Sequence, residues 1–214
     1  MAHKIYLSHS DQHHNTYAVG DTNEAEQMER VAKATEKALL RCGFEVLCET
    51  GISMQQRVIN SNKWGAELHV PIHSNGSVMH NVSGTRMFYW DKQGAGYRAC
   101  LCIFNRLAPL TPGTSENIRQ NQSLYEMRVP YCPSVYIETE FHDVPETAQW
   151  IIDHVQDIGE AITQGICDYF GVQYVLPDNK LYRIQLGAFK SLDNASKFLE
   201  DVRKNYSDAF IVEV

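Results

Sequence analysis

Short apolar runs alternate with segments of helical spacing along most of the chain, and this alternation limits the possible folds more than any other feature. Apolar and β-branched runs predict buried strands, whereas apolar residues three and four apart predict helices. Strands are expected at residues 4–8, 44–48, 67–73, 85–90 and 134–138, and helices at about 24–42, 96–107 and 145–170. This order of elements predicts a layered α/β fold.

The first expected helix has clear boundary signals. Asn23 is placed to cap its start, Glu26 completes a pattern like a capping box, and Gly43 is placed to stop it. Glu24 lies four residues before Met28 and therefore on the core-facing side of the helix. The core-facing positions are Met28, Val31, Ala32, Thr35, Leu39 and Cys42. An acid in the first turn complements the helix dipole, but an inward-pointing carboxylate can also bind a ligand.

The composition fits one globular domain with a small appendage. The chain has 214 residues, of which 43% are hydrophobic and 21% charged. We expect a main domain at residues 1–174, a linker at 175–180 and a small strand, helix, strand segment at 181–214. A loop rich in turn-forming residues at 111–117 is a candidate for shaping a substrate cleft.

Charge and hydropathy argue against several classes of partner. The net charge is −7 and no Lys/Arg cluster is present, so we expect neither nucleic acid nor a membrane surface as a partner. No run reaches the roughly 18 apolar residues of a membrane span, and the first residues do not read as a signal peptide. Synthesis in the cytoplasm is therefore expected. The six cysteines contain no CxxC pair, which argues against a disulfide framework or a cysteine-type zinc site.

Histidines are concentrated in two short segments that follow or end expected strands. The first is Ser8-His-Ser-Asp-Gln-His-His-Asn15, and the second is His69-Val-Pro-Ile-His73-Ser-Asn75. In open α/β sheets the loops at the carboxyl ends of strands converge on the ligand site. Two histidines and a carboxylate such as Glu24, around an open coordination position, are a recurring arrangement for catalytic zinc.

Glu138 ends the expected strand at residues 134–138 and shares a strand face with Tyr136. A carboxylate in this position is often a buried salt-bridge partner. Beside an activated water it can instead act as a general base and then protonate a leaving amine.

These segments, in this order, resemble the motifs of the zinc-dependent N-acetylmuramoyl-L-alanine amidases, a group that includes phage endolysins and bacterial autolysins. The resemblance covers about residues 4–172 and rests on four segments: Lys4-Ile-Tyr-Leu with His14-Asn, Thr22-Asn-Glu24, residues 69–75 and Pro133-Ser-Val-Tyr-Ile-Glu138-Thr-Glu-Phe141. It implies one twisted mixed sheet flanked by helices on both faces. It also implies one Zn²⁺ held by His14, Glu24 and His73, with Glu138 as the catalytic acid/base.

The first of these ligands lies where the chain departs from the family pattern. The common form has a compact Gly-His-Gly-Gly turn, which residues 8–15 lack. His14 is favoured because the following Asn15 resembles a variant Gln-x-His-Asn pattern, with His9 and His13 as alternates. His69 is expected to face elsewhere, because four residues of extended chain span about 13 Å. His80, His142 and His154 are expected to be ordinary surface or core residues.

Contacts with substrate are expected from two polar residues and from the C-terminal segment. Asn75 is placed to orient the scissile amide or a ligand histidine, and Arg128 is placed where similar amidases approach the stem peptide. Residues 182–195 and the apolar run 209–212 resemble the first half of a SPOR domain, a module that binds peptidoglycan glycan strands. A half domain of this kind would either be abbreviated or pair with another copy, so self-association is one expectation.

The resemblance predicts a peptidoglycan hydrolase that cuts the amide between N-acetylmuramic acid and L-alanine. It would act at the cell wall after release or lysis. Two alternatives remain at this point: a non-catalytic wall-binding module, and a zinc peptidase acting on the stem peptide.

Overall fold

The computed structural model describes residues 2–177, 185–207 and 209–213. The chain divides into two compact units, Met1–Pro177 and Asp178–Val214, which are considered separately. The first unit is built from β1 (Lys4–His9), α1 (Glu24–Arg41), β2 (Glu45–Cys48), α2 (Met54–Trp64), β3 (Leu68–Asn75), β4 (Arg86–Tyr89), α3 (Ala95–Leu107), the 3-10 helix η1 (Ala108–Leu110), β5 (Asn117–Gln120), α4 (Tyr125–Arg128), β6 (Tyr136–Phe141), α5 (Pro145–Asp153) and α6 (Val155–Phe170).

One sheet of six strands forms the centre of this unit, in the order β2-β1-β3-β6-β4-β5. The strands β2, β1, β3 and β6 run parallel, whereas β4 pairs antiparallel with β6 and parallel with β5. The carboxyl ends of β1, β3 and β6 therefore meet at one edge. The prediction of a mixed sheet in an α/β fold is confirmed.

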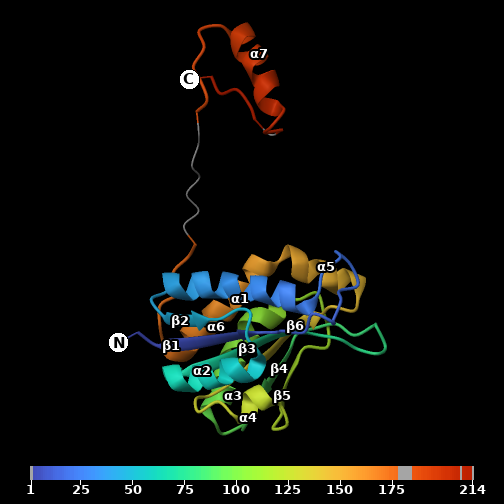
Figure 1. Cartoon of the computed structure of the whole chain (residues 1–214), viewed down its shortest axis with the longest axis vertical. Coiled ribbons are helices and arrows are strands. Elements are labelled where there is room, and N and C mark those ends of the chain that lie inside the picture. The colour runs from blue at the N-terminus through green and yellow to red at the C-terminus, as the bar shows by residue number, and fades with distance from the viewer. Residues whose placement is uncertain (1, 178–184, 208, 214) are drawn as a thin grey trace. The chain divides into compact units, whose positions relative to one another are not determined.

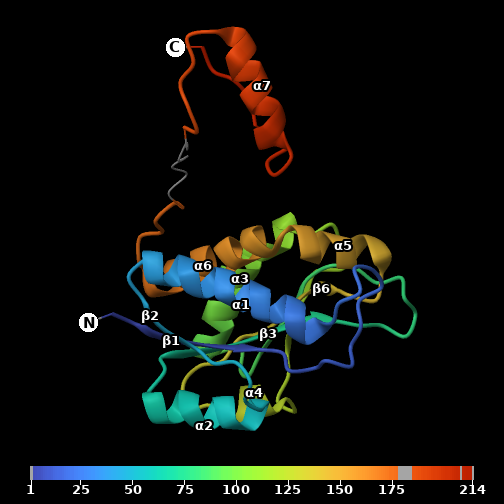
Figure 2. The same ribbon diagram turned by 45° about the horizontal axis from the view of Figure 1, so that its top comes forward.

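Helices cover both faces of the sheet. In two views, α1, α5 and α6 lie on one side and α2 and α4 on the other (Figures 1 and 2). The helix α3 packs against α6 and so joins the first group. The core on this side includes Ile5, Leu7, Val70, Ile72 and Ile137, all fully buried. Strand alternation then turns the intervening residues of β1, β3 and β6 toward α2 and α4.

Two glycines of α6 allow its neighbours to approach closely. A Cβ atom at Gly165 would lie 2.3 Å from Ile103 Cα in α3, and one at Gly159 would lie 2.7 Å from Ala34 Cβ in α1. Backbone atoms cannot move aside as a side chain can, so Gly165 fixes the α3–α6 distance.

The structure departs from the expected elements in three main ways, beyond shifts of one or two residues at their ends. The helix expected at residues 145–170 is two helices, because His154 leaves the helical region (φ −111°, ψ 23°) and its ring contacts the Trp150 carbonyl. The strand expected to end at Glu138 continues to Phe141. The patterns did not predict α2, β5 and α4, since β5 and α4 have four residues each and α2 buries only Arg57, Val58 and Ser61.

The second unit contains one regular element in its described part, the helix α7 (Leu192–Arg203). This agrees with the expected central helix. Residues 185–190 and 209–213 form no strand, which corrects the expected strand, helix, strand unit, and residues 181–184 lie outside the described residues. A single strand is not stable in water without a partner strand, and the described part of this segment offers none. All six cysteines are free, and none of the described helices is long and apolar enough to cross a membrane.

Gly165→Ala should lower the free energy of unfolding of the first unit by about 1–3 kcal/mol, because the added methyl group would overlap the backbone of α3. Gln156→Ala, at an exposed position of the same helix, should change it by less than about 0.5 kcal/mol. Denaturant unfolding followed by circular dichroism measures both. Equal effects of the two substitutions would contradict the close packing.

Candidate active site

Glu24 and His73 meet at the edge where β1, β3 and β6 end. Glu24 begins α1, whose start is fixed by the Asn23 side chain accepting from Glu26 N and by Glu24 N donating to Asn15 O at 2.9 Å. His73 lies near the end of β3. Both residues are buried, and His73 Nδ1 lies 2.8 Å from Glu24 Oε1. The structure thus brings together two of the expected zinc ligands.

Two amide side chains of the loop after β1 also reach this pair. Asn15 Nδ2 donates to Glu24 Oε2 at 2.7 Å, and Gln12 Nε2 lies 3.3 Å from His73 Nδ1. Burial by itself would raise the pKa of Glu24, but the hydrogen bonds and charge of His73 and the Asn15 bond lower it. The Glu24 carboxylate is therefore held in its ionised form.

Glu138 lies on the neighbouring strand β6, paired in register with His73. Its Oε2 atom is buried and has no hydrogen-bond partner. Burial raises the pKa of Glu138 to about 7; the Glu24 charge acts in the same direction and the charges of His73 and Arg86 oppose it. A carboxyl group with a pKa near 7 and a free oxygen is suited to accept and return a proton.

The polar row continues beyond Glu138 across the next two strands. Arg86 of β4 pairs with Glu138 on one side and with Asn117 of β5 on the other. Arg86 Nε and Asn117 Oδ1 are buried without hydrogen-bond partners. Side chains at paired positions share one face of a sheet, so the sheet carries a row of four polar groups that begins at His73.

A second carboxylate lies on the other side of the His73 ring. Glu126 Oε2 of α4 is 3.6 Å from His73 Nε2, which is an ion-pair distance but longer than a hydrogen bond. His69, which was expected to face elsewhere, contacts the same residue, with its Nε2 3.2 Å from Glu126 Oε1. Burial by itself would raise the pKa of Glu126, but His69 and His73 lower it to about 2. Contacts with Glu126 and Glu24 likewise outweigh burial and raise the pKa of His73 to about 10.

The three candidates for the first ligand are not assembled with Glu24 and His73. His13 and His14 are exposed in the turn after β1. His9 is buried, and its register with Ile72 turns it to the α1 side of the sheet, where its Nε2 has no partner. Across the described ranges no three His, Cys, Asp or Glu side chains lie close enough to hold a metal ion.

The expected substrate-binding residues lie near the surface. Asn75 is half-buried at the end of β3 and its Oδ1 accepts from Gly76 N, whereas Arg128 is exposed in α4. His142 is a buried core residue that stacks on Tyr17 and contacts Ser74, while the exposed His80 pairs with Asp143 at 2.8 Å.

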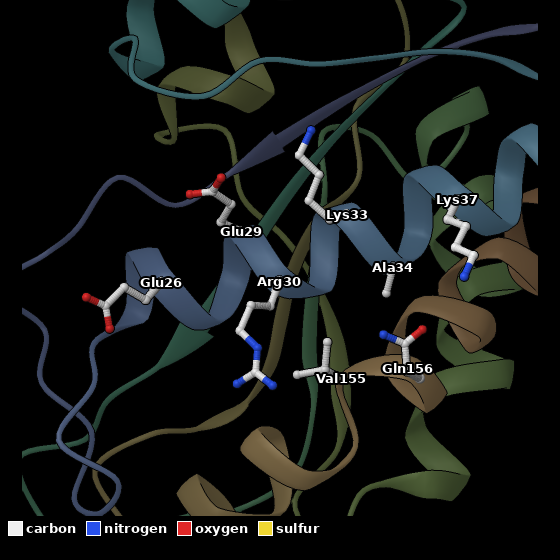
Figure 3. Close-up of a pocket in the computed structure, with 8 residues that line it drawn as sticks. All are labelled: Glu26, Glu29, Arg30, Lys33, Ala34, Lys37, Val155 and Gln156. Carbon is white, nitrogen blue, oxygen red and sulfur yellow. The ribbon is translucent and has the colours of Figure 1, made fainter. Parts of the chain in front are cut away.

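A hollow between α1 and the start of α6 is separate from this site. Its lining contains none of Glu24, His73 and Glu138. The charged side chains Glu29, Arg30, Lys33 and Lys37 point in different directions and do not converge on one centre (Figure 3). The hollow is part of the solvated surface of α1.

Sequence reasoning missed four groups of the site: Gln12, Asn15, Arg86 and Glu126. The first two flank His14 in the Gln-x-His-Asn pattern, in which only the histidine was assigned a role. Arg86 begins a strand that was correctly expected, and so was its partner β6, but its other partner β5 was not. Glu126 lies in a short helix that had no detectable periodicity.

Two protein families match the chain. Residues 5–168 match the family described as N-acetylmuramoyl-L-alanine amidase, and residues 144–213 match the SPOR domain. The second match begins just before α5, spans α5 and α6 of the first unit and includes α7. Both families indicate peptidoglycan as the partner. A search of curated proteins found no similar sequence.

Solved structures of amidases share the fold at low sequence identity. AmiC2 of Nostoc punctiforme, an N-acetylmuramoyl-L-alanine amidase, is 19% identical, with a TM-score of 0.71 over 79% of this chain and 97% of that one. The catalytic domain of CwlV, from Bacillus (Paenibacillus) polymyxa var. colistinus, is 19% identical, with a TM-score of 0.72 over 81% and 100%. An amidase from Clostridium difficile 630 gives 19% identity and a TM-score of 0.69 over 79% and 97%.

The family match spans most of the chain, and the fold of the first unit agrees with it. The chain therefore belongs to the N-acetylmuramoyl-L-alanine amidase family and is a peptidoglycan hydrolase.

Proposed function

We propose that the reaction takes place at the edge of the sheet where Glu24, His73 and Glu138 meet. The bond cut would be the amide between the lactyl group of N-acetylmuramic acid and L-alanine. The observation that carries this assignment is the Glu138 carboxyl group, which has a buried oxygen without a partner and lies in register with His73. An unpaired buried acid is costly to the fold and is expected where it serves chemistry.

The amidase family is generally zinc-dependent, and we propose that Glu24 and His73 provide two ligands to one Zn²⁺. Carboxylate oxygen and imidazole nitrogen are typical zinc ligands, and the pair is already in contact at 2.8 Å. When bound, zinc polarises the scissile carbonyl and lowers the pKa of water. A cation would also balance the charge of the two carboxylates, Glu24 and Glu126, on either side of His73.

We assign the third ligand to His14, with His9 and His13 as alternates. His14 directly precedes Asn15, whose side chain already contacts Glu24, so a change of the short loop would carry His14 toward the pair. His9 is the weaker candidate because it lies on the α1 side of the sheet. His13 lies in the same loop beside Gln12, whose Nε2 is 3.3 Å from His73 Nδ1, and it stays an alternate.

Glu138 would move the proton during hydrolysis. Its carboxylate takes a proton from the attacking water, whose oxygen bonds to the lactyl carbonyl carbon. It then returns the proton to the alanine nitrogen as the C–N bond breaks, which leaves a lactyl carboxylate and a free amine. We assign substrate binding to Asn75 and Arg128, which lie at the surface at the end of β3 and in α4.

The C-terminal segment would add a contact with the glycan strands. Support comes from the SPOR match and from apolar side chains that α7 and its flanks expose, including Leu186, Phe189 and Leu192. Pairing of two such segments remains a prediction that no observation supports. We propose that the enzyme acts at the cell wall after release or lysis.

Glu138→Gln should lower the rate of peptidoglycan cleavage by about 10²- to 10⁴-fold, because the amide cannot accept a proton from water. The measurement is the release of new N-terminal amines from purified peptidoglycan. Glu140→Gln is a matched control and should leave the rate unchanged, since Glu140 is a buried acid on the same strand that also has an unpartnered Oε2 but is not in register with His73. Wild-type rates in Glu138→Gln would remove Glu138 from the mechanism.

The zinc ligands are identified by the zinc affinity of alanine variants, measured in competition with a chromogenic chelator. Glu24→Ala, His73→Ala and His14→Ala should each weaken binding by more than about 100-fold, because a site with one ligand missing binds poorly. His9→Ala and His13→Ala should bind as the wild type does. If either of these two variants lost zinc affinity while His14→Ala kept it, the histidine replaced in that variant would be the third ligand.

A further inference from the structure

Glu126 is a buried carboxylate to which the proposed reaction gives no role. It is 1% exposed and lies in α4, on the side of His73 that faces away from Glu24. A carboxylate inside a protein loses the solvation of water and is retained only where donors replace it.

Groups from two strands and from the segment before a third fix the position of Glu126. The Ser8 hydroxyl of β1 donates to Oε1, and His69 Nε2 of β3 lies 3.2 Å from the same oxygen. The Ser134 hydroxyl, just before β6, donates to the Glu126 carbonyl at 2.7 Å. His69 is itself held, with its Nδ1 3.0 Å from Ser61 Oγ and its ring stacked on Tyr6.

This arrangement commits one carboxylate oxygen and leaves the other for His73. Oε1 serves Ser8 and His69, while Oε2 faces His73 Nε2 at 3.6 Å. The opposite nitrogen, Nδ1, faces Glu24 at 2.8 Å. The His73 ring is also stacked on Tyr136, with centroids 4.5 Å apart, so it cannot easily turn over.

We infer that Glu126 is a positioning residue, whose charge 3.6 Å from His73 Nε2 favours the ring form protonated at that nitrogen and thereby leaves the Nδ1 lone pair for the metal. This inference rests on the proposed zinc site. A histidine ligand commonly donates its second ring nitrogen to a carboxylate, and loss of such a partner typically costs about 10- to 100-fold in metal affinity. His69 and Ser8 act on the site indirectly, because their contacts with Glu126 fix the position of its carboxylate.

Glu126→Gln tests the inference with little change of shape. Ser8 and His69 keep the amide oxygen on their side, so the NH₂ group would face His73 Nε2 as a second donor. Zinc affinity, measured by chelator competition on metal-free protein, should fall about 10- to 100-fold. Nitrogen NMR of the zinc-loaded wild type should show the His73 proton on Nε2.

Glu49→Gln is the matched control, because Glu49 makes its hydrogen bonds to the Tyr6 hydroxyl, at 2.7 Å, and to Asn60 rather than to His73. It should bind zinc as the wild type does. Ser8→Ala removes only one hydrogen bond to Glu126 and should therefore weaken zinc binding by a smaller factor than Glu126→Gln does. If Glu126→Gln does not fold, the zinc affinity of Ser8→Ala tests the inference instead.

The outcomes separate this inference from the proposed function. A wild-type chain that does not bind zinc would overturn the proposed zinc site itself. A wild type that binds zinc, with a folded Glu126→Gln of equal affinity, would overturn only the role of Glu126. A His73 proton found on Nδ1 in the zinc-loaded wild type would also overturn it.

Discussion

The contact between Glu24 and His73 is the constraint on which the site depends. It joins the first residue of α1 to the end of β3, two elements that are distant in sequence. The contact forms only if α1 begins at Glu24, which the Asn23 cap and the Asn15 carbonyl ensure. The pair also fixes the loop after β1, because Asn15 contacts Glu24 and Gln12 contacts His73.

His73 lies between two carboxylates, Glu24 and Glu126, both of which are buried. Burying two negative charges next to one imidazole is unfavourable unless a positive charge balances them. Without a metal, a proton on each ring nitrogen gives His73 one positive charge, which offsets part of this cost and agrees with its raised pKa. A cation at the Nδ1 side would replace one of these protons, so metal binding and proton release would be linked.

Sequence patterns predicted the parts of the fold that have strong periodicity or clear end signals. The start of α1 and the strands β1 and β3 fall in this class, and so does the inward direction of Glu24. Glu126 was not predictable, because its helix has four residues and its partners Ser8 and His69 come from other strands. The first ligand could not be settled either, since the direction of a side chain in the loop depends on contacts of Gln12 and Asn15 that no local pattern encodes.

The products that the zinc-loaded full chain releases from purified peptidoglycan test the reaction assigned to this site most directly. Mass spectrometry should find intact stem peptides that begin with a free L-alanine amine, and glycan strands whose muramic acid carries a free lactyl carboxylate. Peptides cut at an internal bond, or binding to peptidoglycan without any release of these ends, would contradict the assignment of the reaction to this site.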